Sequence, residues 1–526
     1  MTDNPTTRRR RLLRTTVTAA SGAVLLAAAG GVLVAGGELP TDATPVAATT
    51  VDVPATTSVQ VCAGPPRLAT AAAGEDLAYD EFDPEGSGTT TLLGALSLAV
   101  ADSSPGATQL ADLAGTTPVD LPFEGEARVA TVESAGEAMV LRAEPMGDRS
   151  ALATGTSLAT TAAGDLRGLT ATACQPPAAG AWLVGGSTEP GSSAQLVLSN
   201  PGDTPATVTM TGWGSTGPLD MSAAGSVLVP PNGQQVVLLE AVVAGEERLA
   251  LQLDVTGGEV AATLQDSRLR GLVPAGTDLV YPGPPPTDEL VIPGIVLGET
   301  AADDADPSVL RIVNPGEEEV GASVELLGAD GVTPVPGAED LVLDPGVVID
   351  VSLAGLPAGA WSARVTADAP VAAAAMLTST GEPTEADPDT PPVDRAWVPA
   401  TAALETGLVA LPGLADDLAT ARLVMANPAD EPVSATVTPV LGDGTTGEPT
   451  RLDVPAGGSA DTDLTTLAAE PVAAVQVQTD DAATLHAAVH LTAAAPDGAL
   501  LAVVPVPQDT QSARSVAIAP TPRTLG

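Results

Sequence analysis

The sequence contains no lysine; all 20 basic residues are arginines, and there are only two histidines and two cysteines. Without lysine, Walker-type phosphate loops, Schiff-base chemistry and Ser–Lys nucleophiles are excluded. Two histidines and two cysteines are too few for zinc fingers and for most histidine-based triads. A net charge of −46 argues against nucleic acid as a partner, because phosphate binding needs a clustered positive surface. We therefore expect no enzyme activity, no catalytic residue, no cofactor and no metal.

Aromatic residues are also scarce, at 2% of the chain, so the apolar core must consist of alanine, valine and leucine. The 54 glycines and 49 prolines interrupt long helices. Small apolar residues between frequent turn formers favour several small β-domains over one large core. With 44% hydrophobic residues the chain is not disordered in bulk, and 526 residues predict about three to five domains.

The N-terminus has the pattern of a membrane signal. Five arginines within residues 8–14 precede an uncharged apolar stretch at 15–36, which is long enough to span a bilayer as one helix. The arginines predict a cytoplasmic tail at 1–14, so the remaining chain faces outward. Residues 37–57, rich in Thr, Ala and Pro, are predicted to be a stalk. The alternative is a cleaved signal peptide, exported by the general or the twin-arginine route, which would make the protein secreted.

Cys62 and Cys174 both follow this segment. An even number of cysteines in an oxidising compartment predicts a disulfide between them. The alternative is a pair of free buried thiols.

A short pattern that ends in Asn-Pro occurs three times. In each copy apolar residues lie two and four positions before the asparagine, which is the period of a strand with one buried face. The asparagines are Asn200, Asn314 and Asn427, so the copies are 114 and 113 residues apart. Proline then ends the strand because it cannot donate to the ladder. We place the three copies and a C-terminal tail at residues 176–278, 290–380, 395–508 and 509–526.

Each copy continues with further alternating runs, the last two joined by turns that contain Gly or Asp and therefore interpreted as hairpins. Six or seven short strands in roughly 100 residues are typical of an immunoglobulin-like sandwich. The predicted fold is therefore all-β: tandem immunoglobulin-like β-sandwiches after one N-terminal transmembrane helix, each burying its own core. The expected hairpins join residues 249–255 to 260–264, 361–365 to 371–377, and 472–477 to 485–491.

Residues 58–175 are predicted to form a further β-rich domain that resembles a degenerate fourth copy. Its end, Gly-Asp-Leu-Arg-Gly-Leu at 164–169, is similar to Arg-Leu-Arg-Gly-Leu at 268–272. The runs at 128–132 and 138–142 are interpreted as its last hairpin.

Several motifs resemble an actinobacterial family of unknown function, DUF5719. The resemblance covers most of the chain after residue 58, and its most specific part runs from Cys174 to Gly202. It implies a membrane-anchored envelope protein, in some genomes encoded near a family 2 glycosyltransferase, and it brings no known activity or catalytic residue. The matching segments are residues 62–68, 164–169, 182–188 and 196–202, together with Cys174.

Few residues qualify as site candidates. Trp213 lies between two glycines and is expected to be exposed, where it could contact a ligand, whereas the other three tryptophans lie at strand positions typical of a core. His486 and His490 share one strand face about 13 Å apart, too far to chelate one ion together. The acidic loop at 81–86 lacks the final glutamate of a calcium loop, and the acidic run at 303–306 is interpreted as solvated charge.

These observations lead us to expect a non-enzymatic scaffold or adhesion protein of the cell envelope, anchored in the membrane and largely extracytoplasmic, whose partner is an envelope protein or a glycan. The alternative is a carbohydrate-binding or carbohydrate-processing module of envelope polysaccharide assembly. A glycoside hydrolase that uses two of the 66 acidic residues is a third hypothesis.

Overall fold

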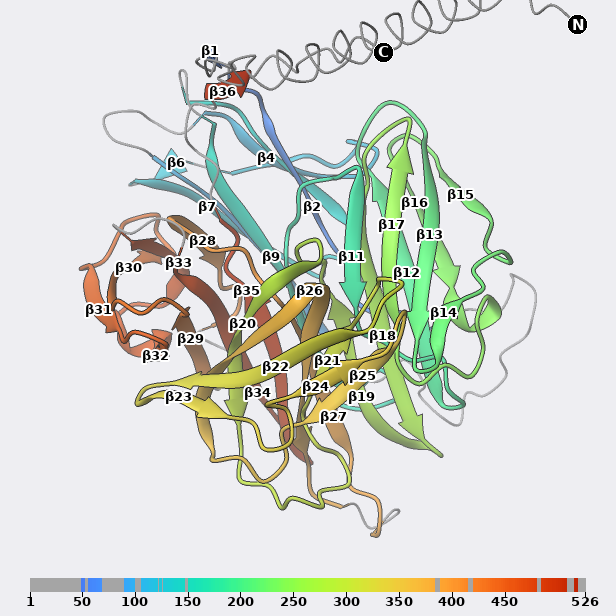
Figure 1. Ribbon diagram of the computed structural model, residues 1–526. Coiled ribbons are helices and arrows are strands. Elements are labelled where there is room, and N and C mark those ends of the chain that lie inside the picture. Colours follow the sequence, from blue (N-terminus) through green and yellow to red (C-terminus); the bar gives the residue numbers. More distant parts are fainter. Residues whose placement is uncertain are drawn as a thin grey trace, which may run out of the picture. The chain divides into compact units, whose positions relative to one another are not determined.

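The computed structural model describes residues 49–52, 55–68, 89–99, 106–121, 123–124, 126–146, 150–383, 388–414, 420–479, 484–508 and 515–518. Within them nearly all regular structure is strand, and the only helices are the short 3₁₀ turns η1 (Leu239–Ala241) and η2 (Leu464–Thr466) (Figure 1). The all-β prediction is confirmed. None of the helices in the described ranges has the length and apolar character needed to cross a bilayer. The predicted basic tail at 1–14 and anchor at 15–36 lie outside the described residues.

The chain divides into two compact parts. The smaller part comprises residues 1–53 and 514–526, in which β1 (Thr49–Asp52) pairs antiparallel with β36 (Ser515–Ile518). Segments predicted to be stalk and C-terminal tail therefore contribute one strand each. The larger part, residues 54–513, contains every other described element.

The larger part consists of four consecutive units, I to IV, each built from two antiparallel sheets. Unit I contains β2 (Ser58–Cys62), β3 (Thr90–Leu98), β4 (Thr108–Asp112), β5 (Val119–Asp120), β6 (Phe123–Glu124), β7 (Ala127–Glu133), β8 (Met139–Ala143), β9 (Leu152–Thr161) and β10 (Gly168–Ala173). Unit II contains β11 (Gly180–Val184), β12 (Ser192–Asn200), β13 (Ala206–Gly214), β14 (Gly217–Leu219), β15 (Ser226–Val229), β16 (Gly233–Leu238), β17 (Ala250–Thr256), β18 (Ala261–Arg270) and β19 (Val273–Val280).

Units III and IV complete the larger part. Unit III contains β20 (Thr287–Leu297), β21 (Val309–Val313), β22 (Val320–Gly328), β23 (Gly331–Pro334), β24 (Leu341–Leu343), β25 (Val348–Ser352), β26 (Gly359–Thr380) and β27 (Val393–Pro399). Unit IV contains β28 (Thr406–Ala410), β29 (Thr420–Asn427), β30 (Val433–Leu441), β31 (Thr450–Val454), β32 (Gly458–Asp463), β33 (Val472–Thr479), β34 (His486–Ala495) and β35 (Gly498–Pro505).

All four units share one strand order. Each unit has eight equivalent strands, which are numbered here from first to eighth along the chain. One sheet has the strand order first-sixth-third-fourth, and the other has the order fifth-second-seventh-eighth. The strands β6, β14 and β23 are short additions, and β26 supplies both the sixth and the seventh strand of unit III. The orders are β2-β8-β4-β5 and β7-β3-β9-β10, β11-β17-β13-β15 and β16-β12-β18-β19, β20-β26-β22-β24 and β25-β21-β26-β27, and β28-β33-β30-β31 and β32-β29-β34-β35.

The sixth and seventh strands belong to different sheets, so the hairpins predicted in units II to IV are wrong. The hairpin predicted at 128–132 and 138–142 is wrong too, because β7 and β8, the fifth and sixth strands of unit I, also lie in different sheets. In unit II, β17 pairs with β11 and β13, whereas β18 pairs with β12 and β19. In unit III a single strand, β26, passes from one sheet into the other. The immunoglobulin order keeps its sixth and seventh strands in one sheet, and the units differ from it here. Alternation identifies a strand with one buried face but does not reveal its neighbour.

The repeated asparagine fastens the end of the second strand to the start of the third. Asn200, Asn314 and Asn427 are all 0% exposed. In each, the side-chain amide donates to the carbonyl four residues later, at 2.8, 2.7 and 2.7 Å. It also donates to a carbonyl at the end of the fourth strand or just beyond it. The side-chain oxygen accepts from the backbone N–H two residues later. The sequence repeat is therefore a repeated buried hydrogen-bond clamp.

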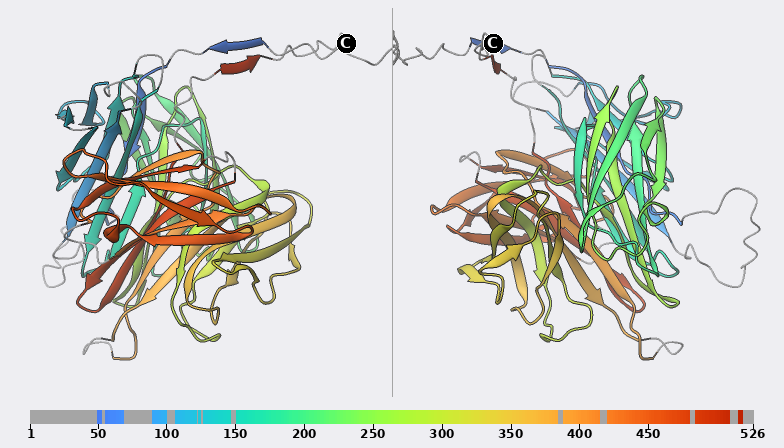
Figure 2. Two further views of the ribbon diagram at one scale, coloured as in Figure 1. Left: turned by 90° about the vertical axis from the view of Figure 1, so that its left-hand side faces the viewer. Right: turned by 45° about the vertical axis from the view of Figure 1, so that its right-hand side comes forward.

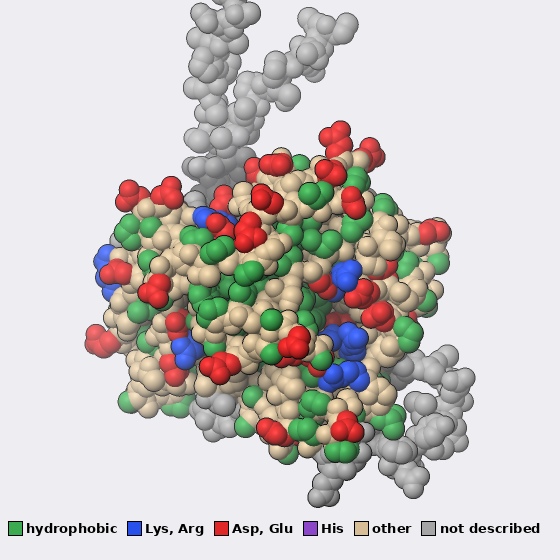
Figure 3. Space-filling view, turned by 60° about the horizontal axis from the view of Figure 1, so that its bottom comes forward, with side chains coloured by type: hydrophobic (Ala, Val, Ile, Leu, Met, Phe, Trp, Pro, Cys, Tyr) green, Lys and Arg blue, Asp and Glu red, His purple; other side chains and the backbone are tan. Residues whose placement is uncertain are grey.

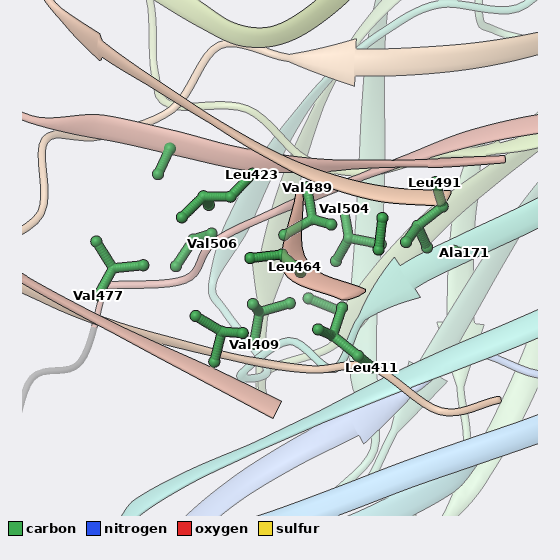
Figure 4. Close-up of a cluster of buried hydrophobic side chains, with 14 of the residues drawn as sticks. Ala171, Val409, Leu411, Leu423, Leu464, Val477, Val489, Leu491, Val504 and Val506 are labelled. Carbon is green, nitrogen blue, oxygen red and sulfur yellow. The ribbon is translucent and has the colours of Figure 1, made fainter. Parts of the chain in front are cut away.

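Units II, III and IV each have an apolar cluster of their own, as expected, but apolar packing also continues from one unit to the next. The cluster between the sheets of unit IV includes Ala171 of β10 in unit I, which Figure 4 shows beside Leu491. The cluster of unit II includes Val313 and Trp397 of unit III, and that of unit III includes Ala488 of unit IV. Several strands are therefore buried on both faces, β10 and β27 along their whole length. Small residues permit such close packing of sheets.

The eighth strands of the four units lie together at the centre of the larger part. Strand β19 contacts β10 and β27, and β35 contacts the same two strands. Figure 2 shows, by colour, the sheets of the four units packed against one another. This four-strand junction, formed by β10, β19, β27 and β35, holds most of the buried charged groups described below.

Candidate functional site

The predicted disulfide is confirmed: Cys62, in β2, is bonded to Cys174, directly after β10, across 112 residues of sequence. Both residues are buried, at 0% and 2% exposure. Gly155 of β9 makes room for the bond, because a Cβ there would lie 2.5 Å from the Cys174 sulfur. The bond therefore fixes the first strand of unit I to the end of its last strand.

Buried carboxyl groups connect the units at the four-strand junction. Asp394 of unit III is 0% exposed and accepts hydrogen bonds from the N–H groups of Leu501 in unit IV, at 2.8 Å, and Leu169 in unit I, at 3.3 Å. Asp278 of unit II accepts from the N–H of Trp397 in unit III at 2.6 Å. One side chain, Asp394, thus contacts three units through strongly directional bonds.

Two further polar contacts complete the junction. Asp266 of unit II accepts from the indole Nε1 of Trp397 at 2.9 Å. Arg167 of unit I, 1% exposed, donates to Asp497 of unit IV at 3.0 and 2.7 Å. Each pair joins residues far apart in sequence, so no spacing signal predicts them. The one available signal was the Gly-Asp-Leu-Arg-Gly-Leu motif, which contains Arg167.

Burial raises the pKa of the junction carboxyl groups. The pKa of Asp394 rises to about 7, although three backbone N–H groups and the Arg167 guanidinium oppose the effect of burial. The pKa of Asp278 lies well above its usual range, through burial first and then through repulsion by Asp394 and Asp266. These acids are 0–3% exposed. They do not lie in an open cleft that a polymer could enter, so the geometry suits holding units together.

A hollow of about 450 Å³ lies between units I and II. Its floor is the outer face of β12, β16 and β18, where Gln195 lies opposite Gln265, and Val197 lies between Val236 and Thr263. Its wall is formed by residues 63–67, 112–114 and 136–138 of unit I. Gln195 and Gln265 hold the wall in place, since both donate to the carbonyl of Arg67, at 2.9 and 2.8 Å.

Most of the polar side-chain atoms of this hollow that have no hydrogen-bond partner among the described residues are acceptors. The side-chain oxygens of Gln175, Gln195, Gln234 and Thr263 have no hydrogen-bond partner among the described residues. The one cation in the lining is Arg67, whose guanidinium donates to the carbonyl of Gly136. Apolar contact comes from Val197, Val236 and Leu279. Such a lining suits a neutral ligand that carries several O–H donors.

The expected exposure of Trp213 is wrong. Trp213 lies in β13, is 6% exposed, and stacks on Trp182 of β11 with ring centroids 5.0 Å apart. Gly212 is close to Met221 and Gly214 to Glu246, so the flanking glycines accommodate packing rather than an exposed turn. Trp397 is also buried, whereas Trp182 and Trp361 are half-buried at the edges of clusters.

His486 and His490 share one face of β34, turned away from the core of unit IV and toward unit III. Burial lowers the pKa of each to about 4. The Nδ1 of His486 lies 3.0 Å from the carbonyl of Thr401. Within the ranges that the structure describes, no group of three or more His, Cys, Asp or Glu is placed to hold a metal ion, and the acidic loop at 81–86 lies outside those ranges. The absence of a metal stays a prediction.

Comparison with known proteins identifies a family without a known activity. No curated protein matches the chain. A solved biofilm-associated protein domain, the BSP domain, is 8% identical and covers 90% of this chain and 100% of its own, but the TM-score is 0.13, which carries no argument. The model of the family of unknown function DUF5719 matches residues 129–465. The match spans units II and III, the end of unit I and most of unit IV, which is more than half of the chain, so the chain belongs to the DUF5719 family.

Proposed function

We propose that this protein is a non-enzymatic scaffold or interaction protein of the cell envelope. The observation that carries the proposal is the four-strand junction, where Asp394, Asp278 and Arg167 bind other units of the same chain. These polar side chains are buried and form hydrogen bonds to other units. A body joined in this way presents several sheet faces in fixed relative positions, which is what a scaffold requires.

The proposed location is the outer side of the membrane, held there by the N-terminal segment or secreted if that segment is cleaved. The Cys62–Cys174 disulfide supports an oxidising compartment. The arginines of residues 8–14 before an apolar stretch support export or anchoring.

Affinity purification of the tagged full-length chain from native membranes, after mild crosslinking, tests the scaffold proposal. We expect an envelope protein or polymer to be recovered with the wild type and lost with Asp394→Ala, which breaks the junction. Asp453→Ala is the matched control, since that side chain is 81% exposed on β31. Recovery of the chain without any envelope component would contradict the proposal.

A second candidate function is carbohydrate binding in envelope polysaccharide assembly, and the hollow between units I and II supports it. Its free acceptors on Gln195, Gln234 and Thr263 suit sugar hydroxyl groups, and its aliphatic floor suits C–H contacts. In this candidate function, Gln195, Gln234 and Thr263 contact the ligand in place of Trp213.

A glycan array probed with the full-length chain tests this candidate. We expect binding to neutral oligosaccharides that Thr263→Val combined with Gln234→Leu abolishes. Gln235→Leu makes the same change at the next residue, on the opposite face of β16, and should leave binding intact. Binding to no neutral glycan, or binding that the double variant retains, excludes this hollow.

A further inference from the structure

Another hollow, of about 320 Å³, lies where units III and IV meet. Unit III contributes the end of β20, part of the segment 298–308 and the end of β26, and unit IV contributes β34 and the start of β35. Three carboxylates line it, those of Glu299, Asp304 and Asp306, and its described lining contains no arginine. Part of the acidic run at 303–306 therefore belongs to a hollow between two units.

His490 brings a nearly buried imidazole without a partner into this hollow. It is 6% exposed and lines the hollow from β34. The ring of His486, four residues earlier, lies 3.0 Å from the carbonyl of Thr401, whereas the ring of His490 has no hydrogen-bond partner in the described part of the chain. Burial, together with repulsion from Arg422, lowers the pKa of His490 to about 4, so the ring is neutral near pH 7. A neutral imidazole has one acceptor nitrogen, which here is available to a donor group of a bound molecule.

The negative charge of the hollow is only partly neutralised by the chain itself. Asp306 pairs with Arg270 at 2.7 Å through its Oδ2, and its N–H donates to Oδ1 of Asp304 at 3.0 Å. The other oxygen of Asp304 and the carboxylate of Glu299 have no hydrogen-bond or ion-pair partner among the described residues. Figure 3 shows one face of the protein, on which acidic side chains are spread widely and basic ones are few. In a chain of net charge −46, such a lining favours a cation.

We propose that this hollow binds a primary ammonium group carried on a small hydroxyl-bearing molecule. His490 accepts a hydrogen bond on the buried side of the hollow, and the carboxylates of Asp304 and Glu299 supply the compensating charge. Thr380 adds a hydroxyl group, and Leu353 adds an apolar contact for the carbon skeleton. An organic cation is favoured over a metal ion, because no group of three or more His, Cys, Asp or Glu in the described ranges is placed to hold one. The inference goes beyond the proposed function and does not depend on it.

Thermal unfolding of the full-length chain at about pH 6.5 tests the site, with glucosamine hydrochloride compared with glucose plus sodium chloride at equal ionic strength. The two sugars are similar in size, but only glucosamine carries an amino group, which is protonated at this pH. We expect glucosamine to raise the midpoint of the wild type by a few degrees, as a ligand of the folded state does, and glucose to leave it unchanged. An equal effect of the two sugars would overturn the proposal.

Two variants test the residues of the site. His490→Leu removes the acceptor nitrogen, and Asp304→Asn removes a charge but keeps an oxygen for the N–H of Asp306. Each should abolish the rise with glucosamine. Asp453→Asn makes the same change as Asp304→Asn at an 81% exposed side chain of β31 and should keep the rise. A rise that either site variant retains would contradict the proposal.

Stability without ligand separates binding from folding. In sodium chloride alone His490→Leu should be at least as stable as the wild type, because it removes a nearly buried polar ring that has no partner in the described part of the chain. A less stable His490→Leu would show that the imidazole serves the fold, and it would overturn the assignment of this residue to a ligand.

Ethanolamine then distinguishes the sources of the ammonium group. A rise with glucosamine alone indicates an amino sugar, and a rise with ethanolamine indicates a smaller amino alcohol, such as a lipid head group. No rise with either amine would overturn the proposal.

Discussion

Single buried polar residues determine how this chain is held together. Asp394 shows the principle, because its carboxyl group accepts from backbone groups of units I and IV while its own strand belongs to unit III. Removing such an acceptor leaves buried N–H groups without a partner, which costs more than the net value of the bonds themselves.

Stability should depend on pH through Asp394. In the unfolded chain its carboxyl group loses its proton near pH 3.8, whereas in the folded chain the pKa is about 7. The folded state therefore binds more protons across this window, and stability falls as the pH rises through it. His486 and His490, with pKa values lowered to about 4 from 6.5, act oppositely, because near pH 6.5 the unfolded chain still binds part of their protons and the folded chain does not. We therefore expect the free energy of unfolding of the wild type to fall relative to that of Asp394→Asn, which keeps both histidines, from pH 6.5 to 8 in urea denaturation.

Two variants of Asp394 separate charge from hydrogen bonding. Asp394→Asn keeps an acceptor and does not titrate, so it should lack the contribution of Asp394 and gain stability relative to the wild type between pH 6.5 and 8. Asp394→Ala should be less stable by roughly 2–4 kcal/mol at all pH values, because the N–H groups of Leu169 and Leu501 lose their acceptor. A pH profile of Asp394→Asn identical to that of the wild type would show that Asp394 does not change its protonation in this range.

The free energy of unfolding should depend equally on the buried asparagines of units II, III and IV. In Asn314→Ala the carbonyls of Glu318 and Leu343 lose a buried donor. We expect a loss of roughly 2–4 kcal/mol in denaturant unfolding. Asn314→Asp has the same shape but cannot donate, so it should be at least as destabilising. An unchanged Asn314→Asp would mean that shape alone matters here.

At the scale of strands, alternation predicted which segments are strands but not their partners. The runs at 249–255 and 260–264 are indeed strands, β17 and β18, yet they lie in different sheets. Pairing depends on the path of the connection, and a short turn is compatible with either outcome. The disulfide was predictable because only two cysteines are present. The junction was not, because Asp394 of unit III meets Asp266 and Asp278, which are cross-strand partners within unit II, only when the units pack.

Strands that are buried on both faces should not tolerate larger side chains. Ala488 of β34 faces unit III, and a Cβ on Gly294 would already lie 2.9 Å from its Cβ. We expect Ala488→Leu to lower the free energy of unfolding by roughly 1–3 kcal/mol through overpacking. Ala494→Leu, at an exposed position of the same strand, should be neutral. Equal stability of the two variants would mean that the contact between units III and IV accommodates a larger side chain.

At the scale of the larger part, shared clusters and a common junction imply that the four units unfold together. The distribution of tryptophan allows a direct test. All four tryptophans lie in units II and III, at positions 182, 213, 361 and 397, whereas strands of all four units contribute to far-ultraviolet circular dichroism. Independent units would give separate transitions for the two signals, and one cooperative body gives coincident transitions.

Loss of the disulfide makes that test decisive, because the bond lies in unit I, which contains no tryptophan. Closing a loop of this length is worth about 5 kcal/mol in the chain-entropy model, so Cys62→Ser should weaken unit I markedly. If the units are coupled through β10 and β19, the tryptophan fluorescence midpoint should shift downward together with the dichroism midpoint. The surface change Arg451→Gln in unit IV should shift neither. A fluorescence midpoint that stays in place while the dichroism changes would show that unit I unfolds alone, and the junction would then be a contact between independent domains.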